Sequence, residues 1–161
     1  LSGGRHVAVM GESGKGKTTL LKLLLGFIEP MEGEIIRAEG EKPAVVFQED
    51  RLLPWFSALK NVQLAGGNAE ELLEDMELKE SMDKLPKELS GGMQRRTTIA
   101  RALAYKGDPL LLDEPFKGLD PEMRERIAGK IVKRAEGASI LLITHDEKEA
   151  ELLKCEEIIR I

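Results

Sequence analysis

A glycine-rich loop near the beginning of the chain lies between an apolar segment and a helical one. Residues 11–18 read Gly-Glu-Ser-Gly-Lys-Gly-Lys-Thr, which fits the pattern G-x-x-x-x-G-K-[ST]. The apolar residues 7–10 predict a strand before the loop, and residues 17–25 predict a helix after it. A strand, a glycine turn and a helix in this order predict an α/β fold whose first strand leads into a phosphate-binding loop.

The loop has the chemistry needed to hold the phosphates of a nucleotide. Its glycines allow several backbone N–H groups to converge on one phosphate, and the helix that follows adds its partial positive charge. Lys17 can reach the β- and γ-phosphates, and the Thr18 hydroxyl can bind Mg²⁺. The residues predicted to bind the nucleotide here are Gly11, Glu12, Ser13, Gly14, Lys15, Gly16, Lys17, Thr18 and Thr19.

Strand and helix patterns alternate along most of the remaining chain. Residues 34–37, 44–47, 110–112 and 140–143 predict further strands, and residues 93–105 predict a helix. Another helix is expected with Asp120 as N-cap and Pro121 as its first residue, and Thr144 with Glu147 predicts a capping box before the next one. We therefore expect a mostly parallel sheet flanked by helices.

The middle of the chain differs from this alternation. It contains a Gly-Gly-Asn break at residues 66–68 and a short acidic helix with Leu72, Leu73 and Met76 on one face. We interpret residues 55–89 as a small helical subdomain inserted into a core of residues 1–54 and 90–161. The 161 residues then form a single domain.

The composition excludes several classes of protein. Hydrophobic residues make up 42% and charged residues 33%, which is typical of a globular protein and not of a disordered one. The net charge of −5 argues against a nucleic-acid-binding surface, and no apolar run approaches the length of a membrane span. The single cysteine, Cys155, has no cysteine or histidine beside it, and we interpret it as structural.

Two acids end the apolar run at residues 110–112. Asp113 and Glu114 would be costly there unless a ligand used them, because burying a charge without a partner is unfavourable. After a phosphate-binding loop, the first acid suits Mg²⁺ and the second suits a general base that activates the attacking water. The alternative is an acidic turn in contact with solvent.

A second phosphate-receiving segment lies at residues 89–92, Leu-Ser-Gly-Gly. Ser90 is a plausible N-cap of the helix that follows, and Gly91 and Gly92 allow a ligand to approach the backbone closely. Because the chain already has its own phosphate-binding loop, we expect this segment to face the γ-phosphate of a nucleotide bound by another copy. Two copies arranged head to tail would then bury two nucleotides in composite sites.

These segments together resemble the nucleotide-binding domain of ATP-binding cassette (ABC) proteins. The family's motifs occur here in the family's order and cover essentially the whole chain. They are the Walker A motif at 11–18, the Q-loop residue Gln48, the signature at 89–92, the Walker B acids Asp113 and Glu114, the D-loop residue Asp120 and the H-loop residue His145. The resemblance implies the P-loop NTPase (RecA-like) fold, with ATP and Mg²⁺ as cofactors.

The resemblance also implies roles for three polar residues that have simpler alternatives. Gln48 would contact Mg²⁺ and the attacking water, His145 would bond to the γ-phosphate and position Glu114, and Asp120 would cross the dimer interface. Taken alone, Gln48 is a turn residue, His145 is a structural histidine and Asp120 is an N-cap. The expected catalytic set is Glu114, His145, Lys17 and Gln48, and the expected metal ligands are Thr18, Gln48 and Asp113.

Details of the sequence narrow the resemblance and also depart from it. Residues 46–55 and Met93 are similar to importers of the nitrate/sulfonate/taurine group, although Gln is commonest in the family at the position of Met93. The apolar residues at 52–56 either dock a membrane subunit or pack beneath the helical subdomain. Only ten residues precede Gly11, so we expect the family's N-terminal antiparallel strands to be largely missing, and the adenine-stacking residue is unassigned.

The resulting hypothesis is an ATPase subunit of an ABC transporter that imports a solute. Its expected partners are a second copy of the chain, transmembrane permease subunits and a solute-binding protein, with no nucleic acid. This places it in the cytoplasm, on the inner face of the cell membrane. The main alternative is a soluble ABC-type ATPase. A small-molecule P-loop kinase leaves residues 89–92 and His145 unexplained, and a non-catalytic ATP-binding module leaves Glu114 unexplained.

Overall fold

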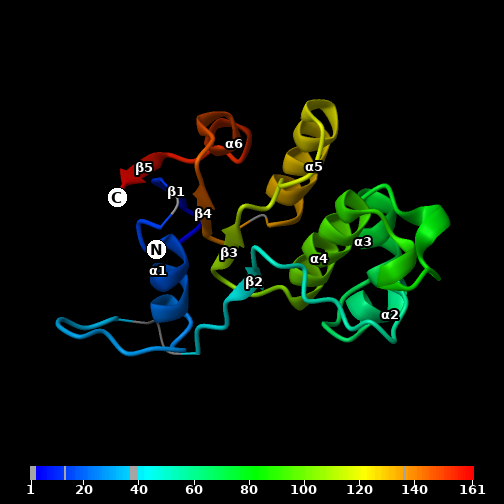
Figure 1. Cartoon of the computed structure of the whole chain (residues 1–161), viewed down its shortest axis with the longest axis horizontal. Helices are drawn as coiled ribbons and strands as arrows, with labels where there is room; N and C mark the ends of the chain where they lie inside the picture. The colour runs from blue at the N-terminus through cyan, green and yellow to red at the C-terminus, as the bar shows by residue number, and fades with distance from the viewer. Residues whose placement is uncertain (1–2, 13, 37–39, 136) are drawn as a thin grey trace.

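The fold is a parallel sheet with helices on both faces, as a computed structural model of the chain shows (Figure 1). The structure describes residues 3–12, 14–36, 40–135 and 137–161. Within these ranges, five strands lie in the order β2-β3-β4-β1-β5, and each pair of neighbouring strands is parallel. The strands are β1 (His6–Met10), β2 (Ala44–Val46), β3 (Leu110–Asp113), β4 (Ile140–Thr144) and β5 (Glu157–Arg160).

The helices divide between the sheet and one end of the molecule. They are α1 (Lys17–Leu24), α2 (Ala58–Gln63), α3 (Ala69–Asp75), α4 (Gly91–Tyr105), α5 (Pro121–Arg134) and α6 (Glu147–Leu152), with short 3₁₀ turns η1 (Lys79–Ser81) and η2 (Pro86–Glu88). In Figure 1, α2 and α3 lie beside α4, at the opposite end of the molecule from β5. Leu72, Leu73 and Met76 are all buried, which confirms the apolar face predicted for this segment.

The strands are apolar on both faces because each face is covered by a separate core. Val7, Leu111 and Ile143 face the side of α1, where Leu21 is buried. Their neighbours in the strands, such as Ala8 and Leu112, join a larger core that includes residues of α3, α4, α5 and α6. A strand buried on both faces reads as a continuous apolar run, which explains why β3 and β4 were visible in the sequence.

Several predicted helix ends are confirmed. The Ser90 hydroxyl accepts a hydrogen bond from the backbone N–H of Met93 (3.3 Å), so α4 begins at Gly91, two residues earlier than expected. The Asp120 carboxylate accepts one from the N–H of Met123 (2.9 Å), and Pro121 opens α5 as predicted.

Two local predictions are wrong. Residues 34–36 form no strand, and Arg37, the last residue of that expected strand, lies outside the described residues. Thr144 does not cap α6 either: Asp146 is the N-cap, because its carboxylate accepts from the N–H of Lys148 (2.9 Å). The Thr144 hydroxyl instead accepts from the N–H of Asp146 and donates to the Glu149 carboxylate (2.5 Å).

Candidate nucleotide-binding site

The glycine-rich loop that is predicted to bind phosphate connects β1 to α1. Gly14 and Gly16 have φ values of 85° and 91°, a left-handed backbone that favours glycine, and Gly16 directly precedes the first turn of α1. The Lys17 ammonium group donates to the carbonyls of Gly11 (2.6 Å) and Glu12 (2.8 Å), which holds the positive charge over the loop. The predicted residue Ser13 lies outside the described residues.

The loop, the two acids and two further predicted residues line one hollow of about 550 Å³. It lies where β1, β2, β3 and β4 end, which is the edge of a parallel sheet where ligands bind. The Nδ1 atom of His145 lies 3.5 Å from a carboxylate oxygen of Glu114. The lining residues are Glu12, Gly14, Gly16, Lys17, Thr18, Thr19, Gln48, Asp113, Glu114 and His145.

Asp113 is the buried acid of this hollow. Only 4% of its surface is exposed, and burial together with the neighbouring Glu114 charge raises the pKa of its carboxyl group, against the opposing charges of Arg95 and Lys17. Its side chain receives no hydrogen bond from any residue that the structure describes. A buried carboxylate without a donor suits a cation, although no cluster of three or more acidic, histidine or cysteine ligands occurs within the described ranges.

Glu114 is held in an unusual conformation. Its φ of +46° is in the left-handed region, which a residue with a side chain rarely adopts. Its N–H donates to the carbonyl of Ile143 (2.9 Å), so the turn after β3 is tied to the neighbouring strand β4. The carboxylate lies in the hollow, where a general base would have to be.

The two neighbours of His145 in the chain are held by side-chain hydrogen bonds and ion pairs. Thr144 and Asp146 on either side belong to a network with Arg124, whose guanidinium lies 2.6 Å from the Asp146 carboxylate and 3.4 Å from that of Glu149. The imidazole itself is 73% exposed on the side of the hollow. This network positions the backbone of His145 and leaves its ring free to contact a ligand.

The predicted signature and D-loop residues line a different hollow, of about 650 Å³. Ser90, Gly91, Gly92 and Asp120 all border it, and Gln48 borders both hollows. Gly91 is exposed, and a side chain at this position would meet no heavy atom within 4 Å. Gly11 and Lys15 line a third hollow, which shares Glu12 and His145 with the first.

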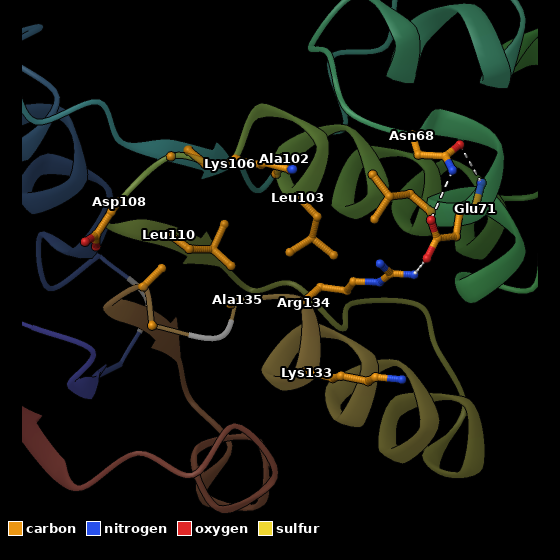
Figure 2. Close-up of a pocket in the computed structure, with 15 residues that line it drawn as sticks. Asn68, Glu71, Ala102, Leu103, Lys106, Asp108, Leu110, Lys133, Arg134 and Ala135 are labelled. Carbon is orange, nitrogen blue, oxygen red and sulfur yellow. Dashed lines mark hydrogen bonds and ion pairs between the residues drawn. The ribbon is translucent and has the colours of Figure 1, made fainter.

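Figure 2 shows a further cavity, of about 570 Å³, that contains none of the predicted site residues. It is lined at one end by Ala44 and Leu110, the first residues of β2 and β3, and therefore lies at the sheet edge opposite the acids. Arg134 of α5 reaches across to Glu71 of α3 on its border, as the dashed line marks.

A buried arginine beside the site was not predicted from the sequence. Arg95 of α4 is 2% exposed and donates to backbone carbonyls of both the Gln48 and the Glu114 segments. Arg96, which is also buried, and Arg101 occur on the same helix, so the sequence gave no sign of which arginine contacts these two segments.

Comparison with known proteins places these features in a family. Residues 1–117 match the model of the ABC transporter family. The aliphatic sulfonates import ATP-binding protein SsuB of Granulibacter bethesdensis is 44% identical over 93% of this chain and 66% of its own length. The bicarbonate transport ATP-binding protein CmpD of Synechocystis is 39% identical over 93% of this chain and 61% of its own length. The taurine import ATP-binding protein TauB of Chromobacterium violaceum is 41% identical over 97% of this chain and 67% of its own length.

A solved structure agrees with this placement. The ATP-binding cassette MJ0796, as a dimer in a post-hydrolysis state bound to ADP and Pi, matches with a TM-score of 0.87 and 31% identity, over 100% of this chain and 82% of that one. The chain spans about three fifths to two thirds of the length of the curated relatives it matches. The fold, the order of its motifs and these similarities together show that the chain belongs to the ABC transporter family, where its relatives are named for aliphatic sulfonate import, taurine import and nitrate transport.

Proposed function

We propose that this chain binds and hydrolyses MgATP as the ATPase subunit of an ABC importer. The observation that carries the proposal is the convergence of Lys17, Asp113, Glu114 and His145 in one hollow at the carboxyl edge of the sheet. The relatives are named as import or transport ATP-binding proteins, which favours a transport role over that of a soluble ABC-type ATPase.

In this proposal the phosphates lie over the loop before α1. Lys17, now bonded to the carbonyls of Gly11 and Glu12, exchanges one of these contacts for the β- and γ-phosphates. Glu114 accepts a proton from the attacking water, and His145 holds the γ-phosphate and keeps the Glu114 carboxylate oriented. The rigid turn around Glu114 keeps the base in place without reorganisation during the reaction.

Magnesium fits the residues present. The donor-free, buried carboxylate of Asp113 lies in the same hollow as the Thr18 hydroxyl and the Gln48 amide, and together these are the oxygen ligands that Mg²⁺ prefers. The bound ion would neutralise charge on the phosphate oxygens.

Two copies of the chain would complete each site. The signature residues Ser90, Gly91 and Gly92 lie in a hollow separate from the loop that binds phosphate, so a nucleotide in one copy would meet the signature of another. The dimeric state of the cassette MJ0796 supports this arrangement. Asp120, which borders the same hollow as the signature residues, would then lie at the interface. Residues 55–89 would act as the helical subdomain that carries the signature against the core of 1–54 and 90–161.

A membrane partner would contact the segment after Gln48. Trp55 is 67% exposed there, and Asn61 of α2 fixes the loop before it through hydrogen bonds with the backbone of Leu53, Phe56 and Ser57. A rigid loop with an exposed tryptophan is a typical protein-binding feature. None of the described helices is long and apolar enough to cross a membrane. We propose that the chain is held at the inner membrane face by permease subunits, and that a solute-binding protein delivers the solute to these subunits.

The substitution Glu114→Gln tests the function. We expect ATP binding to be kept, hydrolysis to fall by about 10²–10⁴-fold because the base is lost, and a MgATP-bound dimer to accumulate in size-exclusion chromatography. Glu151→Gln, on the exposed side of α6, is the matched control and should hydrolyse ATP at the normal rate. Hydrolysis at the wild-type rate by Glu114→Gln would remove the general-base assignment.

A further inference from the structure

Arg95 contacts both catalytic segments of the chain at once. It lies in α4, and its side chain is 3% exposed. A guanidinium has five N–H donors, and here they serve six acceptors. These acceptors are the carbonyls of Phe47 (2.5 Å), Gln48 (3.5 Å), Asp113 (2.6 Å), Glu114 (2.6 Å) and Pro115 (3.1 Å), and the Asp50 carboxylate (3.1 Å).

The contacts around Glu114 fix its backbone on both sides. The Nη2 group of Arg95 binds the carbonyl of the peptide before the Cα atom of Glu114 and that of the peptide after it. A non-glycine residue with φ of +46° costs about 1–3 kcal/mol and persists only when its surroundings hold it. With both peptide planes held, the direction of the Glu114 side chain is set.

The other end of the guanidinium contacts the backbone on both sides of the Gln48 Cα atom. Its Nη1 group binds the carbonyls of Phe47 and Gln48, which again flank one Cα atom, and also the Asp50 carboxylate. Gln48 is exposed and follows the end of β2, so β2 itself does not fix its peptide planes. The planar guanidinium therefore sets the spacing between the Gln48 and Glu114 segments.

We propose that Arg95 is a positioning residue that aligns Glu114 and Gln48 with each other and ties both to the signature helix. The inference rests on the proposed ATPase function. Arg95 follows Ser90 by five residues on one continuous helix, so the half-site that faces another copy is mechanically joined to the acids of the chain's own hollow. The conservative change to lysine removes the planar fork and keeps the charge, so a role in positioning is separable from a role in charge balance.

The test compares Arg95→Lys, Arg95→Gln and Arg101→Lys. Arg101 is the matched control because it lies on the same helix and binds the backbone carbonyls of Asp50 and Arg51. It makes no hydrogen bond to the described segment of Asp113 and Glu114. For both Arg95 variants we expect kcat to fall by about 10–100-fold while KM stays within about twofold, since the contacts of the phosphate-binding loop are unchanged. Arg101→Lys should keep kcat within about twofold.

Amide hydrogen exchange gives a second readout that needs no hydrolysis. In the Arg95 variants the N–H of Glu114, bonded to Ile143, should exchange faster, and it should not do so in Arg101→Lys. Wild-type kcat in Arg95→Lys, an equal effect in Arg101→Lys, or failure of both Arg95 variants to fold would overturn the proposal. If the wild-type protein hydrolyses no ATP, the proposed function fails, and the exchange of Glu114 still decides the role of Arg95.

Discussion

Replacing Asp113 with asparagine should make the protein more stable in the absence of nucleotide. Wild-type Asp113 is 4% exposed as a whole residue, and its carboxylate receives no hydrogen bond from the described residues. Reducing the contact of a carboxylate with water without supplying a donor is unfavourable, and complete burial without a partner would cost about 1–3 kcal/mol. Asparagine removes the charge and keeps the volume, and we expect the free energy of unfolding to rise by about 1–2 kcal/mol. For a chain of this size this corresponds to roughly 2–8 °C in Tm.

The stability gained by Asp113→Asn should decrease as the pH is lowered. Because burial and Glu114 raise the pKa of Asp113, its charge destabilises the folded state above that raised pKa. The cost disappears as the pH falls through the raised pKa towards about 3.9, the ordinary value for Asp, where both states are protonated. The advantage of Asp113→Asn is therefore larger at pH 8 than near pH 4, where the wild-type carboxyl group approaches its ordinary pKa.

The matched control, Asp75→Asn, should lower the free energy of unfolding. Burial raises the pKa of Asp75, but hydrogen bonds from Arg134 (2.6 Å) and Lys130 (3.2 Å) outweigh it, so the pKa is lowered and the charge stabilises the fold. After allowance for solvent screening we expect a loss of about 1 kcal/mol. The wild-type contribution is present above about pH 3.9 and is lost as the pH falls through the lowered pKa, so the deficit is constant between pH 5 and 8.

Urea denaturation of the three proteins at pH 4, 6 and 8 measures both effects. At pH 8 we expect Asp113→Asn to be more stable than the wild type and Asp75→Asn to be less stable, and only the first difference should narrow by pH 4. An Asp113→Asn variant that is less stable than the wild type at pH 8 would refute the reasoning. It would show that Arg95 and Lys17 already compensate the buried charge.

Three further substitutions test the packing that supports the site. Gly107→Ala should destabilise the fold by about 3 kcal/mol or more, since a Cβ atom there would lie 2.3 Å from the backbone carbonyl of Lys42. Gly129→Ala, in open space on α5, should instead add about 1 kcal/mol. In thermal denaturation, a Tm that does not fall for Gly107→Ala or does not rise for Gly129→Ala would contradict the corresponding estimate. Asn61→Ala should cost about 2–4 kcal/mol by leaving the backbone groups of Leu53 unpaired, and faster proteolysis near Trp55 would report the released loop.

Much of the fold was predictable because local signals agreed with the tertiary structure. The strand β3 is apolar on both faces and ends in Asp113, so both its burial and the position of the acids could be read from the sequence. The caps Ser90 and Asp120 were also predictable, since each side chain bonds to a backbone N–H three residues later.

The missed features depend on contacts that sequence spacing does not contain. The strand β5 has four exposed residues and is defined by its pairing with β1, so it lacks the apolar run that identified the others. Thr144 looked like a cap, but a buried contact with Glu149 in the same network uses its hydroxyl. The inward direction of Arg95 is set by carbonyls 18 to 48 residues away in the chain.

Mixing two inactive variants tests the central claim, that each ATP site is shared between two copies. Lys17→Ala disables the phosphate-binding loop, and Gly91→Glu places a negative charge where the partner's phosphate would lie, at an exposed position with room for a side chain. Each variant alone should be inactive, and an equal mixture should recover about a quarter of the wild-type ATPase rate, since half of the dimers hold one intact site. A Gly91→Glu variant that is active alone, or a mixture that stays inactive, would contradict the composite site.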